Sequence, residues 1–273
     1  MEIQGSNAHP SLNVIERQPT SATQIPILFV HGANMSAWCW DENFMSFFAK
    51  MGHPTYAVSL RGHGNSGGQH QLASNSISDY VTDIQRVIDE IGVTPILIGH
   101  SLGCLVIQNY IEHTPVPACA LLAPIPVHGL LPSILDLALY NPAFYTPLNL
   151  LQLFGNGSTV VDLARKSIFS GHVSDKVVIR YCAQLQAESP RALLDSLWLG
   201  LPSKKNPFDV PMLALAADED TFFRADHIEK TATAYKADYL VMTNTSHAIM
   251  LDSHWRHSAN AIGAWLNEVE FMS

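Results

Sequence analysis

The sequence is short of charge, and the charge that it has is mainly negative. Only 14% of its 273 residues are Asp, Glu, Lys or Arg, whereas 47% are hydrophobic. The 15 Lys and Arg residues are outnumbered by 24 Asp and Glu residues, which gives a net charge of −9. A chain this apolar is not a disordered one, and its acidic balance argues against nucleic acid or an anionic membrane as partner. We expect a folded chain with a sizeable buried core.

Cysteine is also scarce, and its spacing suggests no bridge and no metal site. None of the four cysteines stands in a Cys-x-x-Cys pair, and no metal-binding spacing joins them to histidines. Three of them fall in apolar helix or strand patterns, where a buried free thiol is the usual interpretation. We therefore predict a reducing compartment and expect neither a metal nor another cofactor. The cysteines are Cys39, Cys104, Cys119 and Cys182.

Long apolar runs are missing altogether. No run approaches the length of a membrane-spanning helix, and residues 1–19 are polar, without the apolar centre of a secretory signal. Internal repeats and low-complexity segments are absent as well. These features predict a protein without a membrane span that resides in the cytoplasm. They say nothing about its oligomeric state.

What the sequence does contain is a regular alternation of short apolar runs and helical patterns. Runs that are apolar on both faces of a strand and are separated by helices predict a mostly parallel sheet, covered on both sides. The fold class is therefore α/β, a doubly wound sheet built from residues 1–125 and 203–273. The expected strands are 12–16, 26–30, 54–60, 95–98, 118–123, 210–217 and 238–242.

The alternation fails between residues 126 and 202. No convincing strand occurs there, and helical patterns punctuated by proline and glycine replace it at 131–140, 148–154, 160–169, 177–186 and 191–199. We predict that this stretch is a helical cap, or lid, inserted into the sheet domain. Its leucine-rich stretches at 130–131, 148–151 and 197–199 offer more apolar surface than one buried stripe per helix requires. The excess is expected to line an apolar pocket.

The chemistry centres on the pentad Gly99-His100-Ser101-Leu102-Gly103, which lies between a predicted strand and a predicted helix. A Gly-x-Ser-x-Gly sequence in that context predicts a sharp turn, a nucleophile elbow, that forces the serine into a strained backbone conformation. The hydroxyl then stands at the carboxyl edge of the sheet, and the positive end of the following helix points at it. Ser101 is the candidate nucleophile.

A serine hydroxyl needs a base to accept its proton, and the base needs an acid to orient it. His247 follows the last predicted strand, 238–242, and is the candidate base. The acid should come from the loop after the preceding strand, where Asp218, Glu219 and Asp220 stand in a row. Asp220 is favoured because it lies furthest into the loop, and Asp218 is the alternative.

The order Ser…Asp…His, in these strand contexts, resembles the α/β-hydrolase superfamily, in particular its serine esterase and lysophospholipase-like members. The resemblance extends over residues 26–266. It implies an oxyanion hole formed by the backbone N–H groups of Ala33 and Leu102, with the Asn34 side chain as an alternative donor. It is carried by Phe-Val-His-Gly at 29–32 followed by Trp40, by Leu-Arg-Gly-His-Gly-Asn-Ser at 60–66, and by the pentad. His31 and 61–64 are interpreted as loop-bracing residues.

The chain departs from the pattern of the superfamily at three positions. Ser59 stands where relatives usually carry an aspartate, Cys104 where a glycine or alanine is common, and Ser246 where glycine is frequent. None of these changes removes a catalytic group. They leave the subfamily open.

The resemblance implies a carboxylesterase that cleaves an ester of a small to medium, apolar substrate through an acyl-enzyme on Ser101. Serine in place of aspartate disfavours epoxide hydrolases and haloalkane dehalogenases. Thioesterases, lactonases, carbon–carbon hydrolases and perhydrolases stay open. So do hydroxynitrile lyases, because residues 31–40 also look similar to plant methylesterases and hydroxynitrile lyases; Lys166 and Lys176 are candidates for the lyase lysine. An alternative of another class is a triad-bearing small-molecule receptor with slow turnover.

Overall fold

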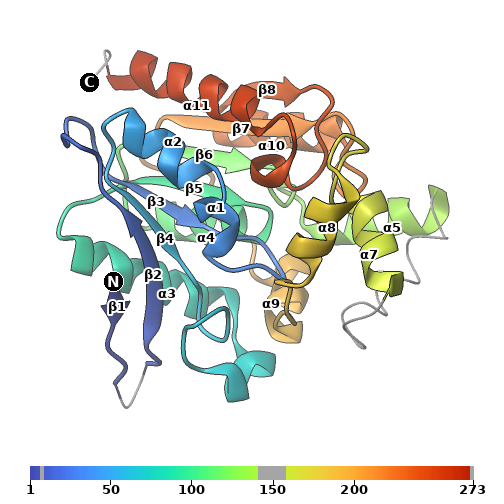
Figure 1. Ribbon diagram of the computed structural model, residues 1–273, viewed down its shortest axis with the longest axis horizontal. Helices are drawn as coiled ribbons and strands as arrows, with labels where there is room; N and C mark the ends of the chain where they lie inside the picture. The colour runs from blue at the N-terminus through green and yellow to red at the C-terminus, as the bar shows by residue number, and fades with distance from the viewer. Residues whose placement is uncertain (7–8, 141–157, 271–273) are drawn as a thin grey trace.

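An eight-stranded sheet forms the centre of the computed structural model, which describes residues 1–6, 9–140 and 158–270 (Figure 1). The strand order is β1-β2-β4-β3-β5-β6-β7-β8. Pairing is parallel from β4 through β3 to β8, whereas β2 pairs antiparallel with both β1 and β4. The strands are β1 (Glu2–Ile3), β2 (Leu12–Arg17), β3 (Ile27–Val30), β4 (Thr55–Val58), β5 (Ile96–His100), β6 (Cys119–Leu122), β7 (Met212–Ala217) and β8 (Asp238–Met242). The predicted mostly parallel α/β sheet is confirmed.

The central strands are buried along their whole length. Every residue of β3, β5, β6 and β7 is buried, as expected for parallel strands that are covered on both faces. This is why they appear in the sequence as continuous apolar runs rather than as an alternation of apolar and polar residues.

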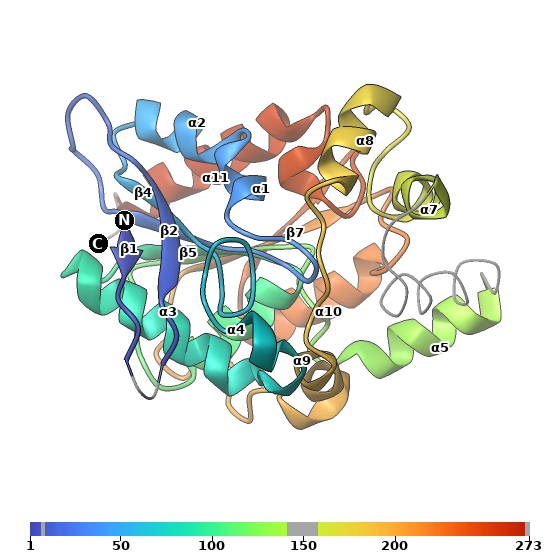
Figure 2. The ribbon, with the colours of Figure 1, turned by 60° about the horizontal axis from the view of Figure 1, so that its bottom comes forward.

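Helices cover the two faces of the sheet (Figure 2). One face carries α1 (Trp38–Asp41), α2 (Phe44–Lys50) and α11 (Trp255–Glu270). The other carries α3 (Ile77–Ile91), α4 (Leu102–Ile111) and α10 (Ala225–Tyr235). Ser76 begins α3 through a reciprocal capping box with Asp79.

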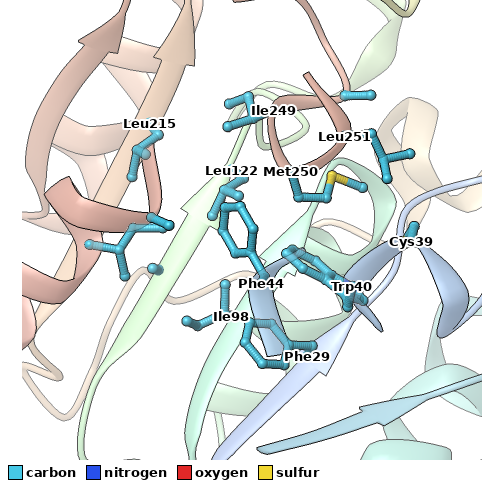
Figure 3. Packing of buried hydrophobic residues seen from close by; sticks show 14 of the residues in the cluster. Phe29, Cys39, Trp40, Phe44, Ile98, Leu122, Leu215, Ile249, Met250 and Leu251 are labelled. Carbon is cyan, nitrogen blue, oxygen red and sulfur yellow. The ribbon is translucent and has the colours of Figure 1, made fainter. Parts of the chain in front are cut away.

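Aromatic side chains from β3, α1 and α2 pack against one another within one of the buried clusters (Figure 3). The Phe29 ring on β3 lies 4.9 Å from the Trp40 ring and 6.5 Å from that of Phe44, centroid to centroid. All three side chains are completely buried. Aromatic pairs at such distances add to the free energy gained by burial itself, and here they fix the loop after β3 against the sheet.

Between β6 and β7 the described residues form helices and loops but no strand. The helices are α5 (Leu130–Tyr140), α7 (Ser158–Ser167), α8 (Asp175–Cys182), α9 (Pro190–Leu194) and η2 (Asp195–Leu199). Figures 1 and 2 show them gathered at the end of the sheet where the parallel strands finish. The predicted helix 148–154 lies outside the described residues, and the cap limits 126 and 202 stay predictions.

Two short helical elements were not predicted from the sequence, η1 (Gln69–Ser74) and η3 (Ile249–Leu251). Each is too short to show a helical period. None of the helices in the described ranges is long and apolar enough to cross a membrane.

The junction of β5 and α4 depends on a close backbone approach at Gly103. A Cβ atom built on Gly103 would lie 2.3 Å from the carbonyl oxygen of Val30 and 2.5 Å from that of His31. Contacts this short do not occur in proteins, and the obstructing atoms belong to backbone, which cannot rotate away. Only glycine lets α4 pack this closely on the end of β3.

We therefore expect Gly103→Ala to lower the free energy of unfolding by about 1–3 kcal/mol, the usual effect of overpacking. Gly171→Ala is the matched control, because a Cβ atom at Gly171 meets nothing within 4 Å. The control should stay within about 0.5 kcal/mol of the wild type. Urea unfolding measures both, and equal stabilities of the two variants would contradict this account of the junction.

Candidate active site

Ser101 occupies the turn between β5 and α4 in a conformation that few residues adopt. Its φ is 49° and its ψ is −113°, a region that costs a non-glycine residue on the order of 1–3 kcal/mol. The backbone is held there from both sides, because Ser101 N donates to Leu122 O at 3.0 Å and Ser101 O accepts from Cys104 N at 3.0 Å. The strain predicted from the pentad is present.

His247 lies on the loop after β8, and its partner is Asp220. His247 Nδ1 is 2.8 Å from Asp220 Oδ2. The other carboxylate oxygen, Asp220 Oδ1, accepts hydrogen bonds from the backbone N–H groups of Phe222 at 2.8 Å and Phe223 at 3.1 Å. Asp218 instead accepts from Thr245 N at 3.2 Å. Of the two carboxylates considered from the sequence, the structure thus pairs Asp220 with the histidine.

Aromatic rings pack around the His247 imidazole. The ring of Phe222 lies 4.8 Å away and that of Phe223 lies 5.3 Å away, centroid to centroid. Both phenylalanines belong to the loop whose backbone N–H groups hold Asp220. One short segment therefore orients Asp220 and packs against His247 at the same time.

His100 also supports this loop, a role that the sequence analysis missed. Its Nε2 lies 3.0 Å from the carbonyl oxygen of His247. Burial lowers the pKa of His100, which keeps the ring neutral, so that its Nε2–H donates to that carbonyl. A Cβ atom on Gly32 would lie only 2.5 Å from His100 Nδ1. Nothing in the pentad signals this role, which depends on how the loops after β3, β5 and β8 meet.

A pocket of about 410 Å³ brings the predicted site residues together. Ser101, His247, Ala33 and Leu102 all line it. Most of its other walls are apolar and come from the loop after Asp220 and from the helices and loops between β6 and β7. They include Ile125, Leu130, Ile134, Ile168, Leu185, Leu193, Leu194, Leu197, Phe222 and Phe223.

Only some of the leucines that were predicted to line a pocket do so in the structure. Leu130 and Leu197 line the pocket, whereas Leu131 and Leu199 are 41% and 61% exposed. Residues 148–151 lie outside the described residues. The apolar lining therefore comes from part of the stretches expected to provide it.

Two alternatives left open by the sequence find no support in the geometry. The Asn34 side chain, considered as an oxyanion donor, donates its Nδ2 to Gln186 O at 2.9 Å. Lys166 and Lys176, considered as lyase lysines, are exposed and absent from the pocket lining. Over the described part of the chain, no cluster of His, Cys, Asp and Glu has the arrangement of a metal site.

The three departures from the superfamily pattern each have a local partner. Ser59 Oγ accepts from Ala37 N at 3.3 Å. Cys104 Sγ donates to Leu122 O at 3.5 Å, and burial raises the pKa of this thiol well above its usual value, so it stays protonated. Ser246 N donates to Asp252 Oδ2 at 3.3 Å. All four cysteines are buried and free.

Comparison with known proteins identifies the family. The model of the alpha/beta hydrolase family matches residues 27–257. The chain belongs to this family. Over 90 residues it is 33% identical to methyl jasmonate esterase 1 of Vitis vinifera. That match covers 32% of this chain and 34% of the relative, so the compared part spans about a third of the relative's length.

Solved structures share the fold over nearly the whole chain at low sequence identity. A carboxylesterase structure from Nitrososphaera gargenis has a TM-score of 0.75 and 15% identity, and covers 100% of both chains. A putative lipase from Acinetobacter baumannii has a TM-score of 0.75 and 16% identity, over 100% of this chain and 92% of that one. A monoacylglycerol lipase from Paleococcus ferrophilus has a TM-score of 0.70 and 19% identity, over 94% and 99%.

Because Asp220 and not Asp218 pairs with His247, replacing these two aspartates should have different effects. We expect Asp220→Asn to slow covalent labelling of Ser101 by an alkyl fluorophosphonate by about 10²–10⁴-fold, because the imidazole loses the carboxylate that orients it. Asp218→Asn removes an equivalent charge two residues away and should leave the rate within about threefold. Intact-protein mass spectrometry follows the labelling. Equal small effects of both substitutions would place the acid elsewhere.

Proposed function

We propose that this protein is a serine hydrolase that cleaves carboxylic esters of small to medium apolar acids. One observation carries the proposal: a strained serine, and a histidine paired with a buried carboxylate, line the same apolar pocket. Membership of the alpha/beta hydrolase family supports it. So do the names of its relatives, among which esterases and lipases recur.

In the proposed reaction, His247 takes the proton of Ser101 as the hydroxyl oxygen attacks the ester carbonyl. Asp220 holds the imidazole in the tautomer whose Nε2 is free to accept that proton, because Nδ1–H is committed to the carboxylate. The imidazolium then returns the proton to the leaving alkoxide, and an acyl-enzyme remains on Ser101. Water, activated by the same histidine, releases the acid.

The negative charge that develops on the carbonyl oxygen needs donors that are in place beforehand. The backbone N–H groups of Ala33 and Leu102 are the proposed pair. Leu102 is the first residue of α4, so its N–H lies at the positive end of the helix dipole. Loss of one such donor typically lowers the rate on the order of 10²–10³-fold.

The pocket favours an apolar acyl group. Its lining side chains are mostly leucine, isoleucine and phenylalanine, and a volume of about 410 Å³ accommodates a medium-length chain. Among the described residues that line it there is no lysine or arginine, so none of them compensates a second negative charge on the substrate. The helical cap predicted at 126–202 supplies much of this wall, through Leu130, Leu193 and Leu197.

A receptor that retains the same three groups is the alternative of a different class. It would bind its ligand in this pocket and turn it over slowly or once. Sustained hydrolysis of a simple ester, in large molar excess over the protein, discriminates the two. A single burst equal to the protein concentration would favour the receptor.

Replacement of Ser101 tests the proposed nucleophile. We expect Ser101→Ala to remain folded and to lose hydrolysis of p-nitrophenyl hexanoate by roughly 10⁴–10⁶-fold. The substitution removes the attacking oxygen and leaves the pocket in place. Circular dichroism provides the folding control. A variant that keeps a near-normal kcat would exclude Ser101 as the nucleophile.

The acyl preference tests the proposed substrate class. Each buried methylene contributes about 0.8 kcal/mol, or about fourfold in kcat/KM, so kcat/KM should rise from acetate to hexanoate esters. Leu197→Ala should reduce this hexanoate-to-acetate ratio by about tenfold, because it opens the pocket wall. Leu199→Ala is the matched control, since Leu199 is 61% exposed on the same helix. A flat or falling series in the wild type would argue for a different substrate.

A further inference from the structure

Residues 186–189 lie in the connection between α8 and α9 and are bound to two loops at the edge of the sheet. Gln186 N donates to Asn34 O at 3.0 Å, and Asn34 Nδ2 donates back to Gln186 O at 2.9 Å. The Gln186 side chain accepts from Gly64 N at 2.7 Å and donates to Gly62 O at 3.0 Å. The connecting segment is therefore tied to the loop after β3 and to the loop after β4.

Glu188 is the charged centre of this contact. Its Oε2 lies 3.2 Å from His63 Nε2, and the two side chains are 1% and 0% exposed. Its Oε1 accepts from the Tyr80 hydroxyl at 2.7 Å and from Ser189 N at 2.7 Å. Asn34 N donates to Oε2 at 3.4 Å. A carboxylate this deeply buried is costly unless it is paired and hydrogen-bonded, and here it has four partners.

The groups around Glu188 keep it ionised and electrically balanced. Burial opposes the charge on both partners, yet each charge favours the other, so the pKa of His63 is raised and that of Glu188 is lowered. Arg61 next to them is matched by Asp83 and Asp79, at 2.8 Å each. His31 stays neutral, with its pKa lowered to about 3 by burial and by the charge of His63.

Residues 186–188 bind the chain where Ala33 joins Asn34. Asn34 has a φ of 65°, in the left-handed region that non-glycine residues enter only when their surroundings hold them there. Its backbone N–H, its carbonyl oxygen and its side-chain amide are all bound by residues 186–188. Ala33, the proposed oxyanion donor, immediately precedes it.

We propose that Glu188 is a positioning residue that fixes the Ala33–Asn34 peptide through its contacts to Asn34 and His63. It thereby holds Ala33, whose own N–H, in the preceding peptide, is the proposed oxyanion donor. A consequence is that the donor is in place only while segment 186–189 is seated on the core. The inference rests on the proposed function for its catalytic part. Its structural part, that Glu188 limits the mobility of the loop after β3, does not depend on the proposed function.

The test compares Glu188→Gln with Glu42→Gln. Glu42 makes the matched ion pair, because Arg180 Nη1 of α8 donates to Glu42 Oε2 at 3.0 Å and so also joins the helices between β6 and β7 to the core. That pair is solvent-exposed and involves neither Asn34 nor the loop after β4. Both substitutions replace a carboxylate by its isosteric amide.

Amide hydrogen exchange of a peptide covering residues 31–37 is the first measurement. Glu188→Gln should accelerate exchange in this loop by about tenfold or more. Without the fixed carboxylate as a partner of Asn34, opening the loop locally costs less free energy. Glu42→Gln should leave it unchanged. If Glu188→Gln leaves loop exchange at the wild-type rate, the proposal is wrong, whatever the activity of the protein.

Kinetics and an oxyanion mimic form the second measurement. With p-nitrophenyl hexanoate, Glu188→Gln should lower kcat by about 10–100-fold, less than outright loss of a donor, and leave KM within about threefold. The affinity for hexylboronic acid, whose serine adduct is tetrahedral, should fall by the same factor as kcat. A rise in KM alone, or an equal effect of Glu42→Gln, would overturn the proposal. Glu188 would then only attach segment 186–189 to the core, without positioning the Ala33 donor.

Tyr80→Phe keeps the test decisive if Glu188→Gln does not fold. It removes only the hydroxyl that donates to Glu188 and leaves the ion pair with His63 intact. It should change loop exchange, kcat and boronic acid affinity in the same directions by smaller factors, and unchanged values would contradict the proposal. A wild type without Ser101-dependent turnover would refute the proposed function instead, and loop exchange would then decide the present inference.

Discussion

The close approach of α4 to the end of β3 is the constraint on which the site depends. With no Cβ atom at Gly103, the helix backbone comes into contact with the carbonyl oxygens of Val30 and His31. The turn between β5 and α4 must therefore be sharp, and Ser101 has to adopt a left-handed φ of 49°. The free energy that holds it there comes from the two buried apolar clusters on either side of the sheet, because strain persists only where surrounding packing fixes it.

Asp220 and His247 are held in place by hydrogen bonds rather than by a close backbone approach. Asp220 is held by two backbone N–H groups of its own loop, and it in turn holds His247. The Nε2–H of the neutral His100 ring donates a hydrogen bond to the carbonyl oxygen of His247. Because His100 is the residue directly before Ser101, one turn of chain carries the proposed nucleophile and also supports the loop that carries the proposed base.

Much of this arrangement was predictable from local sequence, since it depends on short-range patterns. Continuous apolar runs marked the buried strands, and the predicted strand 238–242 has the same limits as β8. Ser101, Asp220 and His247 follow the parallel strands β5, β7 and β8, which places them at one edge of the sheet. Their catalytic roles and the cap limits remain predictions that the experiments above address.

What the sequence did not reveal lies in contacts between distant segments. Gln186 and Gly64 are separated by 122 positions, and Glu188 and Tyr80 by 108. No periodicity or motif relates such pairs, because their contact depends on how the segment between β6 and β7 packs on the loops of the sheet. His100 is a similar case: its neighbours in the sequence identify the turn, whereas its partner, the carbonyl of His247, lies 147 positions away.

The central claim is that Ser101 becomes acylated. Rapid mixing with a stoichiometric amount of p-nitrophenyl hexanoate, an acid quench and peptide mass spectrometry measure this directly. The account predicts a hexanoyl group on the peptide containing Ser101, formed at the rate of the p-nitrophenol burst and lost at the rate of steady-state turnover. A hexanoyl group on another residue, or turnover with no acylated peptide at any quench time, would contradict it.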